Sequence, residues 1–186
     1  MNRNETASDK IIRAAREIAS TQPFAMIQMQ DIAQKAGISR ATLYRYYTTR
    51  EQVYAEVTLQ WGVGFYERLT STTRQPRDPR KRVHWVLKSI IDEAQSEPHL
   101  IRAFLLCIVQ GASGRHERTA EIHLLLPTLL SYALSVPAES LPTRPVRLLQ
   151  DLLLSSLIGL RRQERDYATV TGDLVYMADI LLFPDR

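Results

Sequence analysis

The stretch Asp31–Val53 decides the fold and reads DIAQKAGISRATLYRYYTTREQV. The apolar side chains at positions 32, 33 and 36 have the spacing of a short helix, which Gly37 ends because glycine readily adopts the left-handed backbone at a helix C-terminus. Ser39 is a good N-cap for a second short helix, and Leu43 lies on the inward face of that helix. Two short helices joined by a tight turn with glycine form a helix-turn-helix, whose second helix enters the major groove of DNA.

The outward face of the second short helix has the side chains that DNA binding needs. Ala41, Tyr44, Arg45 and Thr48 lie opposite the inward Leu43, and no carboxylate follows until position 51. Guanidinium groups bind guanine edges or phosphates, hydroxyl groups bind phosphates, and the methyl group of an alanine contacts thymine. A plain solvent-exposed helix is the alternative, but three tyrosines at positions 44, 46 and 47 are unusual on such a face.

The same residues resemble the pattern of the tetracycline-repressor (TetR) family, I-A-x-x-A-G-V-S-x-G-T-L-Y-x-Y/H-F-x-[ST]-K-E-x-L, which they follow from Ile32 to Val53. The resemblance implies base contacts, direct or close, at positions 40, 42, 45 and 46, and phosphate contacts at positions 44 and 50. Together with the small residue at position 41, the predicted DNA-binding residues are Arg40, Ala41, Thr42, Tyr44, Arg45, Tyr46 and Arg50.

Some positions depart from the residues that the family usually has. Gln28 stands where the family usually has Thr or Ser to cap the preceding helix, and glutamine caps helices poorly. Ala41 replaces a common glycine, and Arg50 replaces a common lysine, which keeps the charge and adds a fork of N–H donors. These departures bear on one phosphate contact, at position 28, and leave the predicted fold unchanged.

The rest of the chain has helical apolar spacing as well, without a convincing alternating strand. We expect a first helix after a cap at Ser8 or Asp9, a long helix from Thr49 past Leu69, and a loop at 74–79. Further helices are expected over 83–94, 98–109, 122–134 (kinked or restarted at Pro127), 146–163 and 169–182. The predicted fold is all-α, with an N-terminal three-helix helix-turn-helix DNA-binding domain (1–52) and a C-terminal helical bundle for ligand binding and dimerisation (53–186).

The last two predicted helices have more apolar surface than one neighbour in the same chain can cover. An exposed apolar patch of that extent is typical of a subunit interface. The TetR resemblance also implies dimerisation through the last two helices. We therefore expect a homodimer with these residues at its interface: Leu149, Leu153, Ser156, Leu157, Leu160, Leu174, Met177 and Leu181.

Several aromatic residues are candidates for lining a ligand pocket in the bundle, although each is also an ordinary core residue. Gly62 and Gly64 lie inside the long helix, where a glycine costs about 1 kcal/mol relative to alanine. Close helix packing, a ligand against the backbone, or a hinge would compensate for that cost. The predicted ligand-binding residues for a hydrophobic or amphipathic effector are Trp61, Gly64, Phe65, Trp85 and Phe104.

Composition excludes some classes of protein and leaves others open. The 24 Lys+Arg against 20 Asp+Glu give a net charge of +4, which is compatible with a polyanionic partner but does not require one. The lone Cys107, in an apolar run, suits a core thiol in a reducing compartment. No apolar run is long enough for a membrane span and no signal peptide is present, which favours the cytoplasm and no membrane contact.

The sequence therefore predicts a regulator, most often a repressor in this family, that binds double-stranded operator DNA and a small-molecule effector. No phosphate loop, nucleophile motif or metal-binding histidine spacing is found, so we expect no catalysis, no cofactor and no metal. A ligand-independent DNA-binding or architectural protein is the first alternative, which the absence of a cavity of about 300–1,000 Å³ would favour. A helical-bundle enzyme is the second, less favoured alternative.

Overall fold

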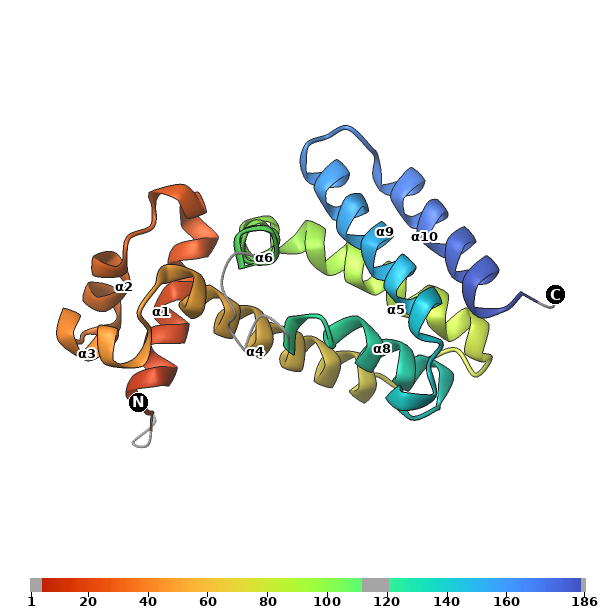
Figure 1. Cartoon of the computed structure of the whole chain (residues 1–186), viewed down its shortest axis with the longest axis horizontal. Coiled ribbons are helices and arrows are strands. Elements are labelled where there is room, and N and C mark those ends of the chain that lie inside the picture. Colours follow the sequence, from red (N-terminus) through yellow and green to blue (C-terminus); the bar gives the residue numbers. More distant parts are fainter. Residues whose placement is uncertain (1–4, 112–120, 185–186) are drawn as a thin grey trace. The chain divides into compact units, whose positions relative to one another are not determined.

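The computed structural model describes residues 5–111 and 121–184, and all regular structure in them is helical (Figure 1), which confirms the all-α prediction. The elements, in chain order, are α1 (Ala7–Thr21), the 3₁₀ turn η1 (Phe24–Met26), α2 (Met29–Ala36), α3 (Arg40–Tyr46), α4 (Arg50–Ser71), α5 (Pro79–Ser96), α6 (Pro98–Gly111), α8 (Leu125–Leu134), the 3₁₀ turn η2 (Ala138–Ser140), α9 (Thr143–Arg161) and α10 (Tyr167–Leu182). The side chain of Cys107 lies outside the described part.

The helices group into two compact units. Unit 1 comprises Met1–Gly64 and Glu97–Ile122, and unit 2 comprises Phe65–Ser96 and His123–Arg186. Unit 1 thus holds the helix-turn-helix together with α6, and α4 contributes residues to both units. The domain boundary predicted between residues 52 and 53 falls inside α4, and a functional division at that point stays a prediction.

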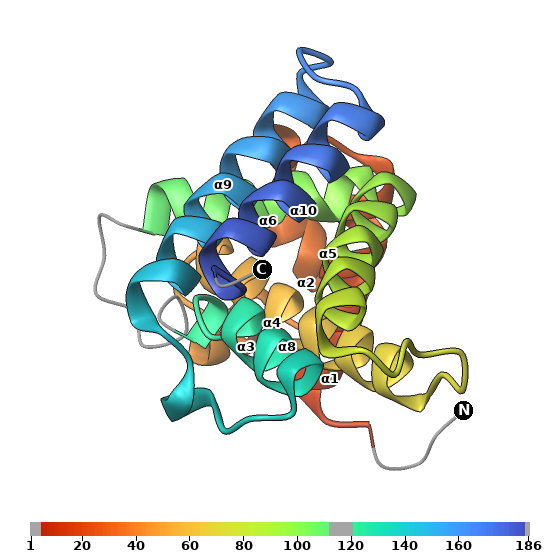
Figure 2. The same cartoon turned by 90° about the vertical axis from the view of Figure 1, so that its right-hand side faces the viewer.

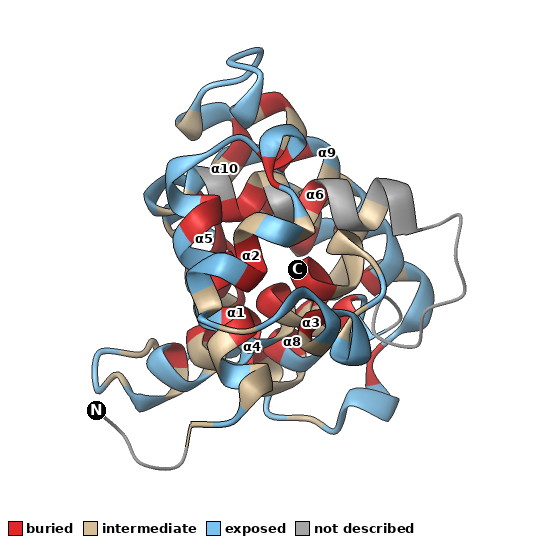
Figure 3. Ribbon diagram, turned by 90° about the vertical axis from the view of Figure 1, so that its left-hand side faces the viewer, coloured by how far each residue is buried: buried red, intermediate tan, exposed pale blue. Residues whose placement is uncertain are grey.

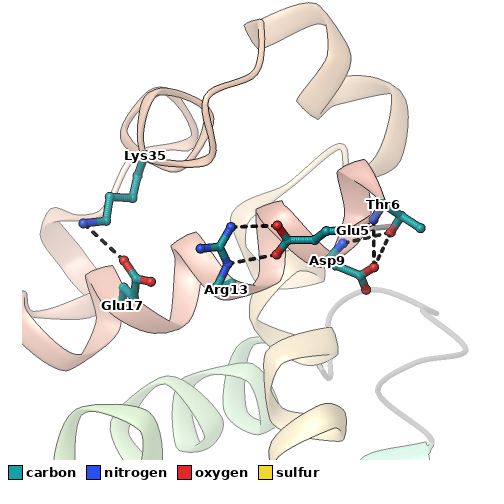
Figure 4. A network of polar contacts seen from close by, with 6 residues as sticks. All are labelled: Glu5, Thr6, Asp9, Arg13, Glu17 and Lys35. Carbon is teal, nitrogen blue, oxygen red and sulfur yellow. Dashed lines mark hydrogen bonds and ion pairs between the residues drawn. The ribbon is translucent and has the colours of Figure 1, made fainter. Parts of the chain in front are cut away.

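Helix α1 begins earlier than predicted because a capping box forms at its start (Figure 4). The Asp9 N–H donates to Thr6 Oγ1 at 3.1 Å, and the Asp9 carboxylate accepts the Thr6 N–H at 3.0 Å. The cap is therefore Thr6 and not Ser8 or Asp9, since this reciprocal pair satisfies two N–H groups that the helix start leaves open. Hydrogen bonds from the Thr6 hydroxyl and backbone hold the pKa of Asp9 below its usual value.

The core of unit 1 is built on α1. Helix α1 has a buried side (Figure 3), which faces α2 and α6. Ile11, Ile32 and Leu43 are fully buried. Helix α4 adds Tyr54, whose buried hydroxyl donates to the Ala15 carbonyl at 2.9 Å. This bond fixes α4 to α1 and so gives the helix-turn-helix a rigid support.

In unit 2, α5 packs against α8 and α10, and α9 lies beside α10 as an antiparallel hairpin (Figure 2). Helix α8 starts at Leu125, and Pro127 lies in its first turn, where a missing N–H costs no helical hydrogen bond. The helix therefore restarts rather than kinks, one of the two outcomes predicted at this proline. Leu87, Leu130, Leu149 and Leu174, one from each of the four helices, are fully buried and form the centre of this unit.

A three-residue cluster attaches α10 to α5. Arg80 Nε donates to Asp179 Oδ1 at 2.7 Å, and His84 Nε2 lies 2.6 Å from the same oxygen. The hydrogen bond from Arg80, with a further one from His84, lowers the pKa of Asp179 below its ordinary 3.8, against the opposing effect of burial. A lowered carboxyl pKa stabilises the fold above the ordinary pKa, and this contribution is lost as pH falls through the lowered value.

We expect Asp179→Asn to lower the free energy of unfolding at about pH 7, and this loss to shrink as pH falls through the lowered pKa of Asp179, because the wild-type carboxyl then becomes protonated as well. Urea unfolding of both proteins across this pH range measures the difference. The control is Asp173→Asn, an exposed carboxylate on the same helix. Equal losses from Asp179→Asn at both ends of the pH range would contradict an ionised Asp179 as the link between α10 and α5.

Candidate functional site

The turn between α2 and α3 has the geometry that the sequence predicts. Gly37 adopts φ 67° and ψ 33°, and the next amide, of Ile38, donates to the Ala33 carbonyl at 3.1 Å. A side chain at Gly37 would meet nothing within 4 Å, so the left-handed backbone and not lack of space favours glycine there. Ser39 then caps α3 by accepting the Thr42 N–H at 3.1 Å, which confirms the predicted cap.

Helix α3 is held to the rest of unit 1 at its middle and just beyond its C-terminal end. Leu43 is fully buried, and beyond the helix the Tyr47 hydroxyl lies 2.9 Å from Ser8 Oγ of α1. At the start of α4 the Gln52 N–H donates to Thr49 Oγ1 at 3.2 Å, which is one of the two hydrogen bonds of a capping box. The Gln52 side chain differs from that box, because its amide oxygen accepts from the Thr48 N–H at 2.7 Å and not from Thr49.

The other side of α3 is exposed and cationic. The Arg40 guanidinium carbon lies 5.4 Å from the centre of the Tyr44 ring, and that of Arg45 lies 5.6 Å from the centre of the Tyr46 ring. Both distances are those of cation–π pairs, which restrict the motion of an exposed arginine. Five of the predicted DNA-binding residues gather on this exposed surface, which we call the α3 face: Arg40, Ala41, Tyr44, Arg45 and Tyr46.

Thr42 and Arg50, also predicted to bind DNA, are placed differently. Thr42 is half-buried, and its hydroxyl lies 2.9 Å from Ser39 Oγ. The Arg50 side chain is 26% exposed, and its Nη1 donates to the main-chain carbonyls of Phe24 at 3.0 Å and Ile27 at 2.8 Å. The side chains of Thr42 and Arg50 are therefore engaged within unit 1, apart from the exposed α3 face.

The predicted ligand-binding residues are distributed over both units. Trp61 and Phe65 are buried, and Gly64, Trp85 and Phe104 are half-buried. Trp61, Gly64 and Phe104 belong to unit 1, whereas Phe65 and Trp85 belong to unit 2. Their burial fits core residues as well as pocket residues, so the ligand site stays a prediction.

The predicted dimer interface stays a prediction. Leu149, Ser156, Leu157 and Leu174 are buried inside unit 2 and face the core of their own subunit. The other four, Leu153, Leu160, Met177 and Leu181, are half-buried. Leucines surround α9 on nearly all sides, so apolar spacing alone does not distinguish its inner face from its outer one.

Three large apolar side chains that were not in the predicted interface are exposed on α9 and α10. Leu148 of α9 is 40% exposed, and Tyr176 and Ile180 of α10 are 65% and 47% exposed. Tyr176 and Ile180 lie one helical turn apart and thus on one side of α10. Gly172, one turn earlier still, is exposed and a side chain there would meet nothing within 4 Å. We call these four residues the α9–α10 apolar patch.

Two further properties concern the described residues alone. No helix within residues 5–111 or 121–184 is both long and apolar enough to span a membrane. In the same part of the chain, no three His, Cys, Asp or Glu side chains come together as ligands for a metal ion.

Comparison with known proteins identifies a domain family for the helix-turn-helix. Residues 11–57 match the family model described as bacterial regulatory proteins, tetR family, and this segment contains α2, its turn, α3 and the start of α4. Over 187 residues the sequence is 22% identical to the HTH-type transcriptional repressor KstR of Rhodococcus jostii, in a match that covers 97% of this chain and 85% of KstR.

The fold is also that of solved TetR-type regulators. A TetR transcriptional regulator from Rhodococcus sp. RHA1 superposes with a TM-score of 0.85 at 19% identity, over 97% of this chain and 98% of that chain. Thermus thermophilus FadR, a TetR-family repressor solved in complex with lauroyl-CoA, has a TM-score of 0.72 at 21% identity, over 96% of this chain and 95% of that chain. These likenesses confirm the predicted order of a helix-turn-helix followed by a C-terminal helical domain.

Proposed function

Because the chain belongs to the TetR family of transcriptional regulators, we propose that it represses transcription as a homodimer that binds operator DNA and responds to an amphipathic small molecule. The family consists of DNA-binding regulators and not of enzymes, which confirms the prediction that the chain is not an enzyme. The observation that carries the proposal is the α3 face, an exposed cationic and aromatic surface on the second helix of a helix-turn-helix.

The α3 face suits the major groove in size and chemistry. Helix α3 has seven residues, and an α-helix with its side chains is about 10–12 Å across, which fits a groove about 12 Å wide. Arg40 and Arg45 bring the group that most often reads guanine, and α3 itself has no acidic residue to repel phosphates. Because each guanidinium lies over a tyrosine ring, part of the entropy cost of ordering it is met before DNA is bound.

The homodimer is proposed from the α9–α10 apolar patch. Regulators with a helix-turn-helix commonly read two half-sites about 34–36 Å apart, or a multiple of that distance, with one subunit each. An exposed tyrosine and isoleucine on one side of α10 provide apolar contacts for a second subunit. Gly172 on the same side lets a partner helix approach closely.

The effector is proposed from the fold and from the buried aromatic residues. Lauroyl-CoA, the ligand of Thermus thermophilus FadR, joins a long acyl chain to a charged nucleotide and is thus amphipathic. Helical bundles bind such ligands between helices lined with apolar and aromatic side chains. We therefore propose a long-chain acyl thioester, or a compound of similar amphipathic character, as the effector of this chain.

The test begins with selection of an operator by the full-length chain from random double-stranded DNA. Lauroyl-CoA is then titrated against the selected complex, with CoA lacking the acyl chain as the matched control. We expect lauroyl-CoA, but not CoA, to lower operator affinity, and the complex to bind lauroyl-CoA more weakly than the free protein by the same factor.

Two results would overturn parts of this proposal separately. Failure to select any sequence over random DNA would contradict operator binding. Selection of an operator whose affinity no acyl thioester changes would favour the ligand-independent DNA-binding protein instead.

A further inference from the structure

We infer that Arg50 is a positioning residue and not a phosphate contact. Its side chain attaches the connection between α1 and α2 to the start of α4. The consequence for DNA binding rests on the proposed function. The consequence for the stability of unit 1 does not, and it is measured first. Arg50 is the first residue of α4, and the atoms that its guanidinium binds lie in the segment 24–27, before α2 begins.

The guanidinium is surrounded by acceptors of this chain. Nη1 donates to two main-chain carbonyls, of Phe24 at 3.0 Å and of Ile27 at 2.8 Å, and Nη2 lies 3.3 Å from a carboxylate oxygen of Glu51. Hydrogen bonds from a charged donor are stronger than neutral ones. A phosphate contact would require Arg50 to give up these partners, whereas Arg40 and Arg45 have no such cost.

An aromatic contact extends the attachment into the core. The Arg50 guanidinium carbon lies 4.2 Å from the centre of the Phe24 ring. Phe24 is buried and meets Tyr54 edge to face, with ring centres 5.0 Å apart, and Tyr54 in turn donates to the Ala15 carbonyl. Arg50 thus completes a continuous set of contacts that joins α4, η1 and α1.

The position favours arginine over lysine on physical grounds. The first turn of a helix has a partial positive charge, so a cation there needs compensating acceptors. The planar fork of arginine reaches two carbonyls and stacks on a ring at the same time, whereas a lysine ammonium is a compact point charge. The common lysine of the family pattern at this position would keep the charge but lose the paired geometry.

The contact matters for DNA binding because α2 and α3 come directly after the segment that Arg50 holds. Ile27, which accepts from Arg50, immediately precedes Gln28, the N-cap residue of α2. The Gln28 N–H donates to the Asp31 carboxylate at 2.9 Å. The start of α2 is therefore held by this bond within the helix and by the Arg50 bond to the residue before it. Since α2 leads through the Gly37 turn into α3, loosening the segment 24–27 would loosen the α3 face.

The experiment compares Arg50→Lys and Arg50→Met with the wild-type chain, and uses Arg45→Lys as the matched control on the exposed α3 face. We expect both Arg50 variants to lower the melting temperature by about 4–8 °C, because lysine does not restore the two carbonyl bonds. Arg45→Lys should leave the melting temperature unchanged.

Binding to duplex DNA across salt concentrations supplies the second readout. The logarithm of the DNA-binding constant falls with the logarithm of the salt concentration, and loss of one phosphate contact makes this negative slope shallower by about 0.9. A positioning role therefore predicts an unchanged slope in Arg50→Met. Non-specific duplex serves for this measurement, which makes the result independent of whether an operator has been found. A wild-type melting temperature in Arg50→Met together with a reduced slope would overturn the inference.

A double-mutant cycle covers the case in which Arg50→Met does not fold. Arg50→Lys and Phe24→Leu are made singly and together, and their effects on the melting temperature are compared. Residues in contact give combined effects that differ from the sum of the single ones. We expect the double variant to lose clearly less than that sum, and strict additivity would contradict the stacked arrangement.

Discussion

Replacing both Tyr176 and Ile180 by glutamate is expected to convert the proposed dimer into a monomer and to lower operator affinity by about 10²–10⁴-fold. Both side chains lie on the exposed side of α10, where a charge costs little in the monomer but is strongly unfavourable in an apolar interface. The loss of affinity arises because linked binding of two half-sites gains that factor over separate binding. Sedimentation velocity measures the oligomeric state, and operator titration measures the affinity.

The matched control for this variant is Leu124→Glu. Leu124 is 60% exposed and precedes α8, so this change introduces a glutamate at an exposed leucine outside α9 and α10. We expect this control to remain dimeric and to bind the operator normally. An intact dimer in the Tyr176 and Ile180 variant, with a helical circular dichroism spectrum, would place the interface elsewhere.

The second large effect is expected from Arg40→Ala combined with Arg45→Ala. If each arginine makes a bidentate contact to a base, the pair contributes on the order of 2–6 kcal/mol of discrimination per half-site. The variant should therefore lose preference for the operator over mismatched sequences and not only affinity. Binding to matched and singly mismatched operators at constant salt measures this preference.

Arg13→Ala is the control for loss of positive charge from unit 1. Arg13 is an exposed arginine of α1, paired with Glu5 at 2.9 Å (Figure 4), and lies outside the α3 face. We expect it to leave operator preference unchanged. If the Arg40 and Arg45 variant instead lost affinity equally for all sequences, both residues would be assigned to phosphates.

The sequence was sufficient to predict features that depend on local backbone chemistry. The end of α2 at Gly37 and the cap of α3 at Ser39 are confirmed, because each depends on one residue type at one position. The start of α1 was misplaced because Thr6, Ser8 and Asp9 are all capping residues, and only the reciprocal bonds between Thr6 and Asp9 decide among them.

Features that depend on distant parts of the chain were harder to predict. A cation at the start of a helix is expected to be exposed, but the carbonyls that bind Arg50 lie 23 and 26 residues earlier in the sequence. No residue spacing encodes such a contact, because main-chain carbonyls occur at every position. In α9, similarly, Leu149 is buried and Leu148 exposed, which only the packing against neighbouring helices determines.

The separation between the α3 face and the buried anchors has a consequence for how such a regulator evolves. Arg40 and Arg45, with their tyrosine partners, are exposed, whereas Leu43 and Tyr54 keep unit 1 folded from its interior. A base change in an operator half-site can thus be compensated by a substitution among the seven residues of α3, with little loss of stability of the protein. Gene duplicates with this scaffold are free to acquire different target sites without first acquiring a new fold.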